Sequence, residues 1–435
     1  MSSRFVQEKV LSIPENASAT RTTKRTKVAF FGIFGIHNLG NECTLQSVLQ
    51  GARRHLPESD IYVISFDPAD TLQRHGMPAV PVTKQTFGQP ARRGLLGRIS
   101  KPFRILRRIK NEAIDWSAAV KALRGTDLMV MTGTGMLTDY STSALGFPYH
   151  VFRWTVAARL ARCKVRFAGV GVGPIYEKLS RWFITKALSL ADYRSFRDQN
   201  SKDRIRKNGF IRDKDPVFPD LVFSLAEESL GKHTAGDGTV RQVGLGVMHH
   251  CDVHLSSDDE HRAQYAAYLE KMCEFIQWLV GHKYTVRILQ GDSKHDAGTR
   301  ADLKTLLAQR GIQYDESGII DEGGDTVEEL IAQIAKVDIV VSPRFHNLLL
   351  GLMMNIPAVS ISYDPKNDYL LEGVGLGDYR QAFSELDVNK LIDQFTKLAA
   401  QSERVKPLIA EKSVVYRALL EDQYEQVFGE LAAKQ

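Results

Sequence analysis

Short apolar runs alternate with longer segments that are apolar at helical spacing over the first half of this chain. Runs of this kind, bounded by polar or Gly residues, predict buried strands, and the longer segments predict helices. The predicted strands are Val28–Phe34, Ile61–Phe66, Leu128–Met131, Val165–Gly169 and Tyr193–Phe196, and the predicted helices are Thr44–His55, Ala118–Arg124, His150–Ala161, Ser180–Ala191 and Ser201–Asn208. Such alternation favours a parallel sheet with helices on both faces.

A polar, Gly-containing stretch, 227–241, is typical of a linker, and the alternation restarts after it. The second series predicts strands Val243–Met248, Thr285–Leu289, Asp338–Ser342 and Ala358–Ile361, and helices His261–Val280, Ala301–Gln309, Thr326–Lys336 and Asn347–Asn355. We therefore expect two doubly wound α/β domains, 28–226 and 242–384, facing a cleft. A polar, basic segment, 1–27, is predicted to be a flexible tail, and 385–435 to form C-terminal helices that pack across both halves.

Composition adds little beyond excluding some classes. A chain of 435 residues with 43% hydrophobic and 25% charged residues is typical of a soluble protein with two domains. Four cysteines without CxxC spacing indicate buried free thiols rather than a disulfide framework. No apolar signal segment is visible at the N-terminus, so we expect a cytoplasmic protein. The net charge of +6 is too modest to indicate nucleic-acid binding.

The segment Asp338–Lys366 carries the strongest functional signal. Arg344 and His346 follow a predicted buried strand at the point where the chain turns into a helix, and Tyr363 and Lys366 follow the next strand. Open α/β sheets bind ligands at the carboxyl ends of their strands, and a helix N-terminus favours anions. This pattern predicts a site for a phosphate or a carboxylate. The alternative is that Arg344 pairs with a nearby acid and His346 caps the helix.

Three further loops follow predicted strands. The first, 35–43, presents Asn38, Asn41 and Glu42 at a helix mouth, although it lacks the GxGxxG pattern of a dinucleotide site. The second, 132–140, contains Gly133, Gly135 and Asp139, and 169–175 resembles it in Gly content. Arg197 stands after the predicted strand Tyr193–Phe196. The alternatives are a turn with Asn caps for the first loop and a surface Arg–Asp pair for Arg197.

A basic segment, 92–110, contains eight cations and no acid, with apolar residues at helical spacing. A basic amphipathic helix favours peripheral contact with an anionic membrane, here the inner face of the cytoplasmic membrane. An inserted surface helix that packs on its own domain is the equal alternative.

Taken in order, these motifs resemble the polysaccharide pyruvyl transferase family over roughly residues 28–380. The matching segments are GIHNLGNE at 35–42, GTGMLTD at 133–139, SFRDQNS at 195–201, PDLVFSL at 219–225 and RFHNLLLGLMMNIPAVSISYDPK at 344–366. Two positions depart from the family pattern: Asn41 stands where Asp is frequent, and Thr134 where Gly is common. The family is similar in architecture to glycosyltransferases of the two-Rossmann, glycosyltransferase-B-like kind.

The resemblance implies transfer of a pyruvyl group from phosphoenolpyruvate to two hydroxyls of a sugar, such as a lipid-linked oligosaccharide for an exopolysaccharide, forming a cyclic ketal. No metal or further cofactor is implied. Guanidinium groups suit the donor's phosphate and carboxylate, and His suits protonation of the enol carbon at neutral pH. The implied donor residues are Arg197, Arg344, Phe345, His346, Tyr363 and Lys366. The implied acceptor residues are Asn38, Asn41, Gly133 and Gly135, and the implied catalytic residues are His346, Asp139 and Glu42.

Two other functions compete with this interpretation. A nucleotide-sugar glycosyltransferase of the same architecture would need an acid for the ribose, and Glu328 or Glu329 could supply it. A non-catalytic sugar- or phosphate-binding module would show a broken donor site. Arg197, Arg344, His346 and Lys366 together argue against that module.

Overall fold

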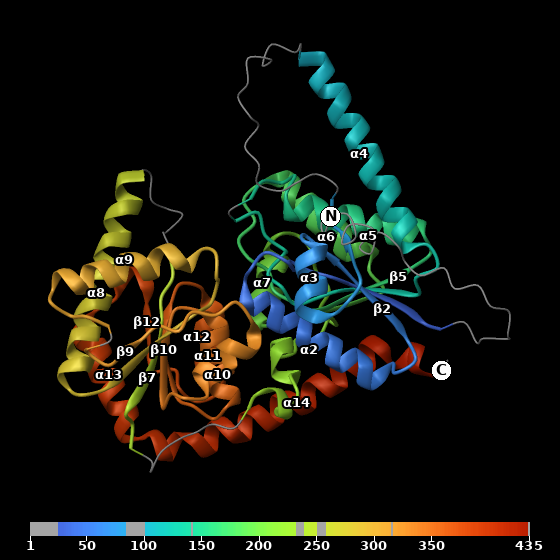
Figure 1. Ribbon diagram of the computed structural model, residues 1–435. Helices are drawn as coiled ribbons and strands as arrows, with labels where there is room; N and C mark the ends of the chain where they lie inside the picture. Colours follow the sequence, from blue (N-terminus) through green and yellow to red (C-terminus); the bar gives the residue numbers. More distant parts are fainter. Residues whose placement is uncertain are drawn as a thin grey trace, which may run out of the picture. The chain divides into compact units, whose positions relative to one another are not determined.

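The computed structural model describes residues 25–83, 101–140, 142–231, 239–249, 258–314 and 316–433, with the backbone alone for 101–106 and 258. The chain divides into two compact units (Figure 1). Unit 1 comprises Met1–Ile36, Thr44–Leu221 and Asp422–Gln435. Unit 2 comprises His37–Cys43 and Val222–Glu421. The short segment His37–Cys43 therefore groups with the C-terminal half of the chain.

Unit 1 is built on a six-stranded parallel sheet with strand order β3-β2-β1-β4-β5-β6. Its strands are β1 Lys27–Phe31, β2 Asp60–Ser65, β3 Ala79–Pro81, β4 Leu128–Met131, β5 Lys164–Val170 and β6 Tyr193–Phe196. Its helices are α2 Leu39–His55, which belongs to unit 1 from Thr44 on, α3 Pro68–His75, α4 Lys101–Leu123, α5 Phe147–Leu160, α6 Lys178–Leu190 and α7 Gln199–Lys207. The order reverses between β1 and β4, where such sheets bind ligands.

Unit 2 repeats the same topology. Its sheet has the order β12-β11-β10-β7-β8-β9, and it reverses between β7 and β10. The strands are β7 Gln242–Gly246, β8 Thr285–Leu289, β9 Ile319–Ile320, β10 Ile339–Ser342, β11 Ala358–Ser362 and β12 Arg380–Ala382. The helices are α8 Asp258–Gly281, α9 Asp296–Gln309, α10 Val327–Ile334, α11 Phe345–Met353, α12 Pro365–Gly373 and α13 Val388–Ala400, with short 3-10 turns at Glu227–Ser229 and Phe383–Glu385. Helix α14 Ser402–Ala432 belongs to unit 2 up to Glu421 and to unit 1 from Asp422 on, and the 3-10 turn Leu221–Ser224 spans the other boundary.

The central strands are apolar on both faces because helices cover both faces of each sheet (Figure 1). In β1, for example, Val28 through Phe31 are all buried. The prediction of a two-domain α/β fold with Rossmann-like parallel sheets is confirmed. Sequence patterns missed the edge strands β3, β9 and β12, since two or three residues are too few to show a periodicity.

Helix starts also differ from the predicted ones. Helix α2 begins at Leu39 rather than Thr44, because Asn38 caps it: its Oδ1 accepts a hydrogen bond from Asn41 N at 3.2 Å. Helix α3 went unpredicted although Asp67 caps it and Gly76 ends it in the left-handed conformation. Helix α4 begins at Lys101, and residues 92–100 of the basic segment lie outside the described residues.

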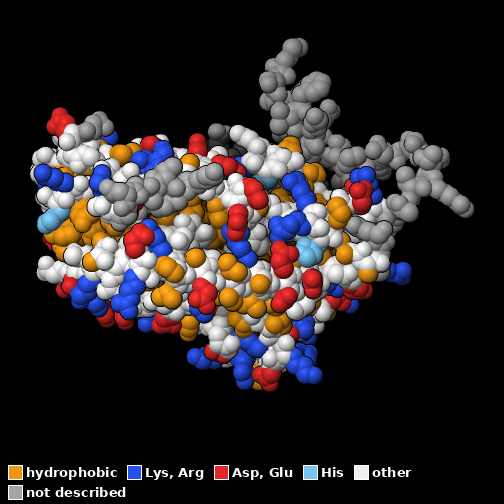
Figure 2. Space-filling model, turned by 90° about the horizontal axis from the view of Figure 1, so that it is seen from below, with side chains coloured by type: hydrophobic (Ala, Val, Ile, Leu, Met, Phe, Trp, Pro, Cys, Tyr) orange, Lys and Arg blue, Asp and Glu red, His pale blue; other side chains and the backbone are white. Residues whose placement is uncertain are grey.

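Three of the four cysteines, Cys43, Cys163 and Cys273, are buried free thiols as predicted, and Cys251 lies outside the described residues. None of the described helices is both long and apolar enough to cross a membrane. The predicted N-terminal tail, apart from its last residues, and the middle of the predicted linker also lie outside the described residues. The face drawn in Figure 2 carries Lys and Arg interspersed with Asp and Glu rather than a continuous basic stripe.

Candidate active site

Arg344 stands at the carboxyl end of β10, beside the point where the sheet of unit 2 reverses its order. Pro343 ends strand pairing, and Arg344 is the extended residue that precedes α11. Its backbone N–H donates to Ser342 Oγ at 3.0 Å, which fixes the turn. The chain therefore delivers a guanidinium to the place where doubly wound sheets bind their ligands.

Asp296, the first residue of α9, orients that guanidinium. Arg344 Nε donates to Asp296 Oδ2 at 3.1 Å, and Nη2 donates to Oδ1. The Asp296 side chain is buried, and its Oδ2 also accepts from the backbone N–H of Asp292. Burial alone would lower the pKa of Arg344, but the Asp296 carboxylate outweighs it and raises that pKa, so the guanidinium stays charged. The pairing confirms one part of the alternative stated for Arg344, and it holds the charge in a fixed orientation.

His346 lies in the first turn of α11 and packs against the N-terminal turn of α2. An ideal Cβ built on Gly40 would lie 2.0 Å from His346 Nδ1, so the imidazole occupies the space that any other residue at 40 would need. Within unit 2, the GIHNLG motif and the RFH motif are therefore in direct contact. The side chain of His346 is half-buried rather than exposed to bulk water.

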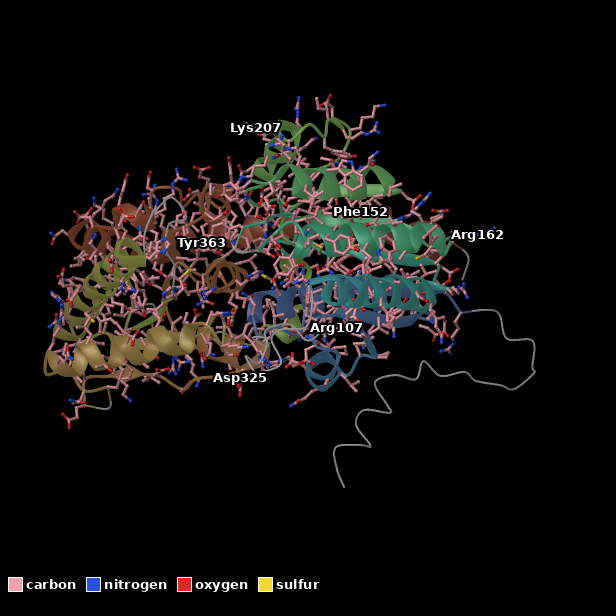
Figure 3. All side chains as sticks on the ribbon, turned by 90° about the horizontal axis from the view of Figure 1, so that it is seen from above. Arg107, Phe152, Arg162, Lys207, Asp325 and Tyr363 are labelled. Carbon is pink, nitrogen blue, oxygen red and sulfur yellow. The ribbon has the colours of Figure 1, made fainter. Side chains whose placement is uncertain are left out.

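Lys366 and Tyr363 follow β11, the strand next to β10. The ammonium of Lys366 lies 4.8 Å from the centre of the Tyr363 ring and 5.7 Å from that of Phe345. Tyr363 is labelled in Figure 3. Both rings hold the cation by cation–π attraction next to Arg344 and His346. The structure thus brings five of the six predicted donor residues into one cluster on adjacent strand ends.

The loop before α2 is fastened to the loop after β8 by backbone hydrogen bonds. Leu39 N donates to Gly291 O at 3.1 Å, and Ser293 N donates to His37 O at 3.1 Å. Asn38 Nδ2 contacts Asp292 Oδ2 at 3.4 Å. The predicted acceptor residues Asn38 and Asn41 and the predicted catalytic residue Glu42, which is buried, all group with unit 2.

In unit 1, the side chain of Asp139 links the GTGMLTD loop to the loop that precedes α6 by hydrogen bonds. Its carboxylate accepts from Tyr176 N at 2.9 and 3.1 Å and from Glu177 N at 2.8 Å. Gly173 N donates to Leu137 O, and Thr138 Oγ1 donates to Pro174 O. The GTGMLTD loop and the GVGVGPI loop are therefore closed onto each other, with the buried Asp139 carboxylate holding the start of α6.

The glycines of the GTGMLTD loop differ in their surroundings. A Cβ on Gly133 would meet Gly169 O at 2.7 Å, whereas Gly135 has open space beside it. Thr134, a departure from the family pattern, is buried and accepts from Ile33 N at 3.1 Å. Its hydroxyl therefore ties the loop after β4 to the loop after β1.

Arg197 follows β6 and lies between two acids of unit 1. Its Nε donates to Asp198 Oδ2 at 3.2 Å, and its Nη1 lies 3.7 Å from Asp220 Oδ2. Asp198 also caps α7 by accepting from Ser201 N. The SFRDQNS and PDLVFSL motifs thus meet at Arg197, whose Nη2 would lie 2.7 Å from a Cβ built on Gly171. Since Arg197 belongs to unit 1, its role toward the donor stays a prediction.

The sequence profile described as Polysaccharide pyruvyl transferase matches residues 38–365, well over half of the chain. The chain belongs to the polysaccharide pyruvyl transferase family. No protein with a curated description matches the sequence. Family membership implies an enzyme, and the profile covers the motifs named above apart from Gly35, Ile36 and His37 at the start and Lys366 at the end.

Solved structures resemble this family member in fold. A putative UDP-N-acetylglucosamine 2-epimerase from Listeria monocytogenes has a TM-score of 0.58 at 10% identity, covering 92% of this chain and 97% of that chain. Anabaena HepE in complex with UDP has a TM-score of 0.54 at 12% identity, covering 94% and 100%. The UDP-GlcNAc 2-epimerase of Neisseria meningitidis bound to UDP-GlcNAc has a TM-score of 0.53 at 11% identity, covering 91% and 99%. At these identities the likeness establishes the glycosyltransferase-B-like fold.

Sequence reasoning missed the loop after β8, in which Asp296 pairs with Arg344, Gly291 packs against Arg344 and His295 bonds to Asp292. A polar QGDSKHD stretch directly after a correctly predicted strand was the available signal. Glu329, one of two acids considered for a nucleotide ribose, is engaged locally: its Oε2 accepts from Asp325 N and Thr326 N in a capping box. Among the described residues no His, Cys, Asp and Glu cluster is arranged to hold a metal ion.

Proposed function

We propose that this enzyme transfers a pyruvyl group from phosphoenolpyruvate to two hydroxyls of a sugar in an exopolysaccharide or another cell-surface glycan, forming a cyclic ketal. The observation that carries the proposal is the convergence of Arg344, His346 and Lys366 at the ends of β10 and β11. A guanidinium, an imidazole and an ammonium at one strand edge fit a ligand that bears a phosphate and a carboxylate. Family membership supports the same reaction class.

The chemistry assigns one role to each cation. In our proposal, Arg344 holds an anionic group of the donor with the guanidinium N–H groups that Asp296 leaves available. Lys366, pressed against two rings, neutralises the second anionic group. His346 donates a proton to the methylene carbon of phosphoenolpyruvate, which makes the adjacent carbon electrophilic. A sugar hydroxyl attacks that carbon, phosphate leaves, and the second hydroxyl closes the ketal.

The proton count defines what else the site needs. Two hydroxyls each lose a proton, one proton ends on the new methyl group, and the other leaves with inorganic phosphate. In our proposal a second group complements His346 by accepting the proton of the attacking hydroxyl while His346 gives its own proton to carbon. Asp139 is poorly suited to that role because its carboxylate already accepts from two backbone N–H groups. In our proposal Asp139 holds its loop in place.

A screen of ligand-induced stabilisation tests the donor. Phosphoenolpyruvate should raise the melting temperature of the protein, whereas UDP-GlcNAc should not. A shift with UDP-GlcNAc alone would instead favour the nucleotide-sugar glycosyltransferase. Release of phosphate from phosphoenolpyruvate in the presence of nitrophenyl glycosides of galactose, glucose and mannose, each with free 4- and 6-hydroxyls, tests transfer. Mass spectrometry of the glycoside should show the added pyruvyl group.

The cellular setting follows from the donor and the acceptor. Phosphoenolpyruvate is a product of cytoplasmic metabolism, so we propose that the reaction takes place in the cytoplasm. A lipid-linked oligosaccharide acceptor would place it at the inner face of the membrane. Fractionation of cells that produce the protein, in low and in high salt, tests this setting.

A further inference from the structure

We propose that His295, held by Asp292, is the base that takes the proton from an attacking sugar hydroxyl. This inference rests on the proposed function and names a residue that neither the motifs nor the family match assigns. His295 immediately precedes α9, in the loop that follows β8. Its side chain is 68% exposed, whereas that of Asp292 is 7% exposed. An exposed imidazole backed by a buried carboxylate is an arrangement in which the carboxylate orients the base.

Hydrogen bonds fix the tautomer of His295. Its Nδ1 lies 3.0 Å from Asp292 Oδ1, and an ionised carboxylate oxygen can only accept. Nδ1 must therefore carry the proton, and in the neutral ring Nε2 is left as an acceptor directed away from Asp292. The same Oδ1 also accepts from the backbone N–H groups of His295 at 2.9 Å and Lys294 at 3.2 Å. The loop thus wraps around the carboxylate and holds the ring.

Short contacts join this pair to the donor cluster within unit 2. Asp296, the next residue, is the partner of Arg344. A Cβ on Gly291 would lie 2.7 Å from Arg344 Cγ, so the loop packs directly on that side chain. Asn38 contacts Asp292, and Gly40, in the following turn, contacts His346. Asp292 bonds to the His295 ring, Lys294 and Asp296 are its neighbours in the chain, and Asp296 pairs with Arg344.

This placement supplies the proton acceptor that ketal formation requires. His346 is half-buried beside the donor and gives a proton to carbon. His295 is accessible to a large acceptor, and its Nε2 takes the proton of the hydroxyl as the carbon–oxygen bond forms. That proton then leaves with the phosphate, and the proton of the second hydroxyl returns to His346 when the ketal closes. Two histidines on neighbouring loops thereby divide the acid and base roles, since one imidazole cannot hold and accept a proton in the same step.

Substitution of His295 in the full chain tests the assignment. His295→Ala should lower phosphate release with the nitrophenyl glycosides about 10²–10⁴-fold while the stabilisation by phosphoenolpyruvate is retained. Free imidazole should restore part of the lost rate. His282→Ala is the matched control, because His282 is also exposed and its Nδ1 also bonds to an oxygen, that of Trp278, but it precedes β8 at the opposite end of the strand.

Turnover of His295→Ala within twofold of His282→Ala would overturn the base role and leave the proposed function standing. Absence of any phosphoenolpyruvate stabilisation in the unmodified protein would overturn the proposed function and the base role together. A measurement without substrate tests the orientation of the His295 ring independently of the proposed function. Nitrogen-15 NMR of labelled histidines should show His295 protonated at Nδ1, and Asp292→Asn should abolish that preference. An Nε2-protonated ring in the unmodified protein would overturn the assignment.

Discussion

His346 Nδ1 lies where a side chain at position 40 would begin: an ideal Cβ on Gly40 would be 2.0 Å from it. The two residues come from the first turns of α11 and α2. A methyl group there must displace the imidazole, because the three atoms nearest to that position all belong to the His346 ring. We expect Gly40→Ala to lower turnover at least tenfold while phosphoenolpyruvate still stabilises the protein. Steady-state phosphate release together with thermal-shift titration measures both.

Gly298→Ala provides the control for that change. Gly298 also lies in a helix, α9, and has open space where a Cβ would be, so this variant should behave like the unmodified protein. If Gly40→Ala were as active as Gly298→Ala, the contact between Gly40 and His346 would not be needed to position His346.

Removing the guanidinium of Arg344 has two consequences that need to be separated. Arg344→Leu leaves the buried Asp296 carboxylate without its partner, which should cost roughly 3–5 kcal/mol of stability. The double variant Arg344→Leu/Asp296→Asn removes the stranded charge, while Asn can still accept from Asp292 N. It should regain much of that stability and still bind phosphoenolpyruvate more weakly by roughly 2–5 kcal/mol. Chemical denaturation and calorimetric titration report the two quantities.

Asp296→Asn alone is the comparison for binding, because it retains the positive charge of Arg344 and loses only its ionic partner. It should bind the donor better than the double variant. Donor affinity in the double variant equal to that of the unmodified protein would exclude Arg344 from the donor site.

His346 is expected to act on the rate rather than on donor affinity. His346→Ala should reduce turnover about 10²–10⁴-fold because the enol carbon then lacks its proton donor. His346→Gln can donate a hydrogen bond but cannot transfer a proton at neutral pH, so it should be equally slow. Both variants should retain stabilisation by phosphoenolpyruvate. A Gln variant with near-normal turnover would show that His346 positions the donor without proton transfer.

Much of this site was predictable because its chemistry stands at the ends of strands. Arg344, His346 and Lys366 follow apolar runs that are rich in β-branched residues, a composition that predicts buried strands. Parallel strands bring their carboxyl ends to the same edge of a sheet, so these three side chains are expected to lie close together. The two-domain fold followed from the same alternation. These residues could be placed together from the sequence because each follows its strand directly and the two strands belong to consecutive βα units.

Contacts between distant loops were not predictable. Asp296 follows β8 and pairs with Arg344, which follows β10, although β7 lies between these strands; nothing in the spacing of either residue indicates the partner. Likewise, segment 37–43 follows the first strand of unit 1 yet groups with unit 2, because its backbone bonds to Gly291 and Ser293. Hydrophobic periodicity describes which face of an element is buried, and it contains no information on which polar loop lies beside which.

His150 provides a pH-dependent prediction for unit 1. Burial, reinforced by the Arg153 guanidinium 3.2 Å from its Nδ1, lowers the pKa of His150 to about 4. The unfolded chain has an ordinary histidine pKa of about 6.5 and so binds the proton first as pH falls. Stability is therefore complete above about pH 6.5 and declines toward pH 4, by up to roughly 3 kcal/mol from this group. Urea unfolding at pH 7.5 and pH 5 should show the loss.

His150→Gln, which does not titrate, should flatten that dependence while lowering stability at pH 7.5 through imperfect packing. The decisive quantity is the difference between the two pH values, not the stability at either. An equal fall in the unmodified protein and in the Gln variant would assign the acid sensitivity to other groups.

The basic segment 92–110 leads to the last prediction, which concerns membrane contact. In its described part, Arg107, Arg108 and Lys110 are exposed on α4, and Ile109 between them is 61% exposed; Figure 3 labels Arg107. The same helix is anchored further along, where Trp116 Nε1 donates to Tyr149 Oη at 2.9 Å. An anchored helix with an exposed cationic, apolar start favours binding to anionic lipid, and each cation contributes about 1 kcal/mol.

Vesicle sedimentation with anionic and neutral lipids measures this contact. Replacing Arg107, Arg108 and Lys110 by Gln should weaken binding to anionic vesicles by about 3 kcal/mol, roughly a hundredfold in partitioning. The matched control replaces three exposed cations elsewhere in unit 1, Lys207, Arg212 and Lys214, at the same cost in net charge. Because the attraction is screened, high salt should weaken binding of the unmodified protein as well. If the two triple variants weakened binding equally, the attraction would come from the net charge of the protein and not from α4. If the protein bound neutral and anionic vesicles equally, α4 would be an ordinary surface helix.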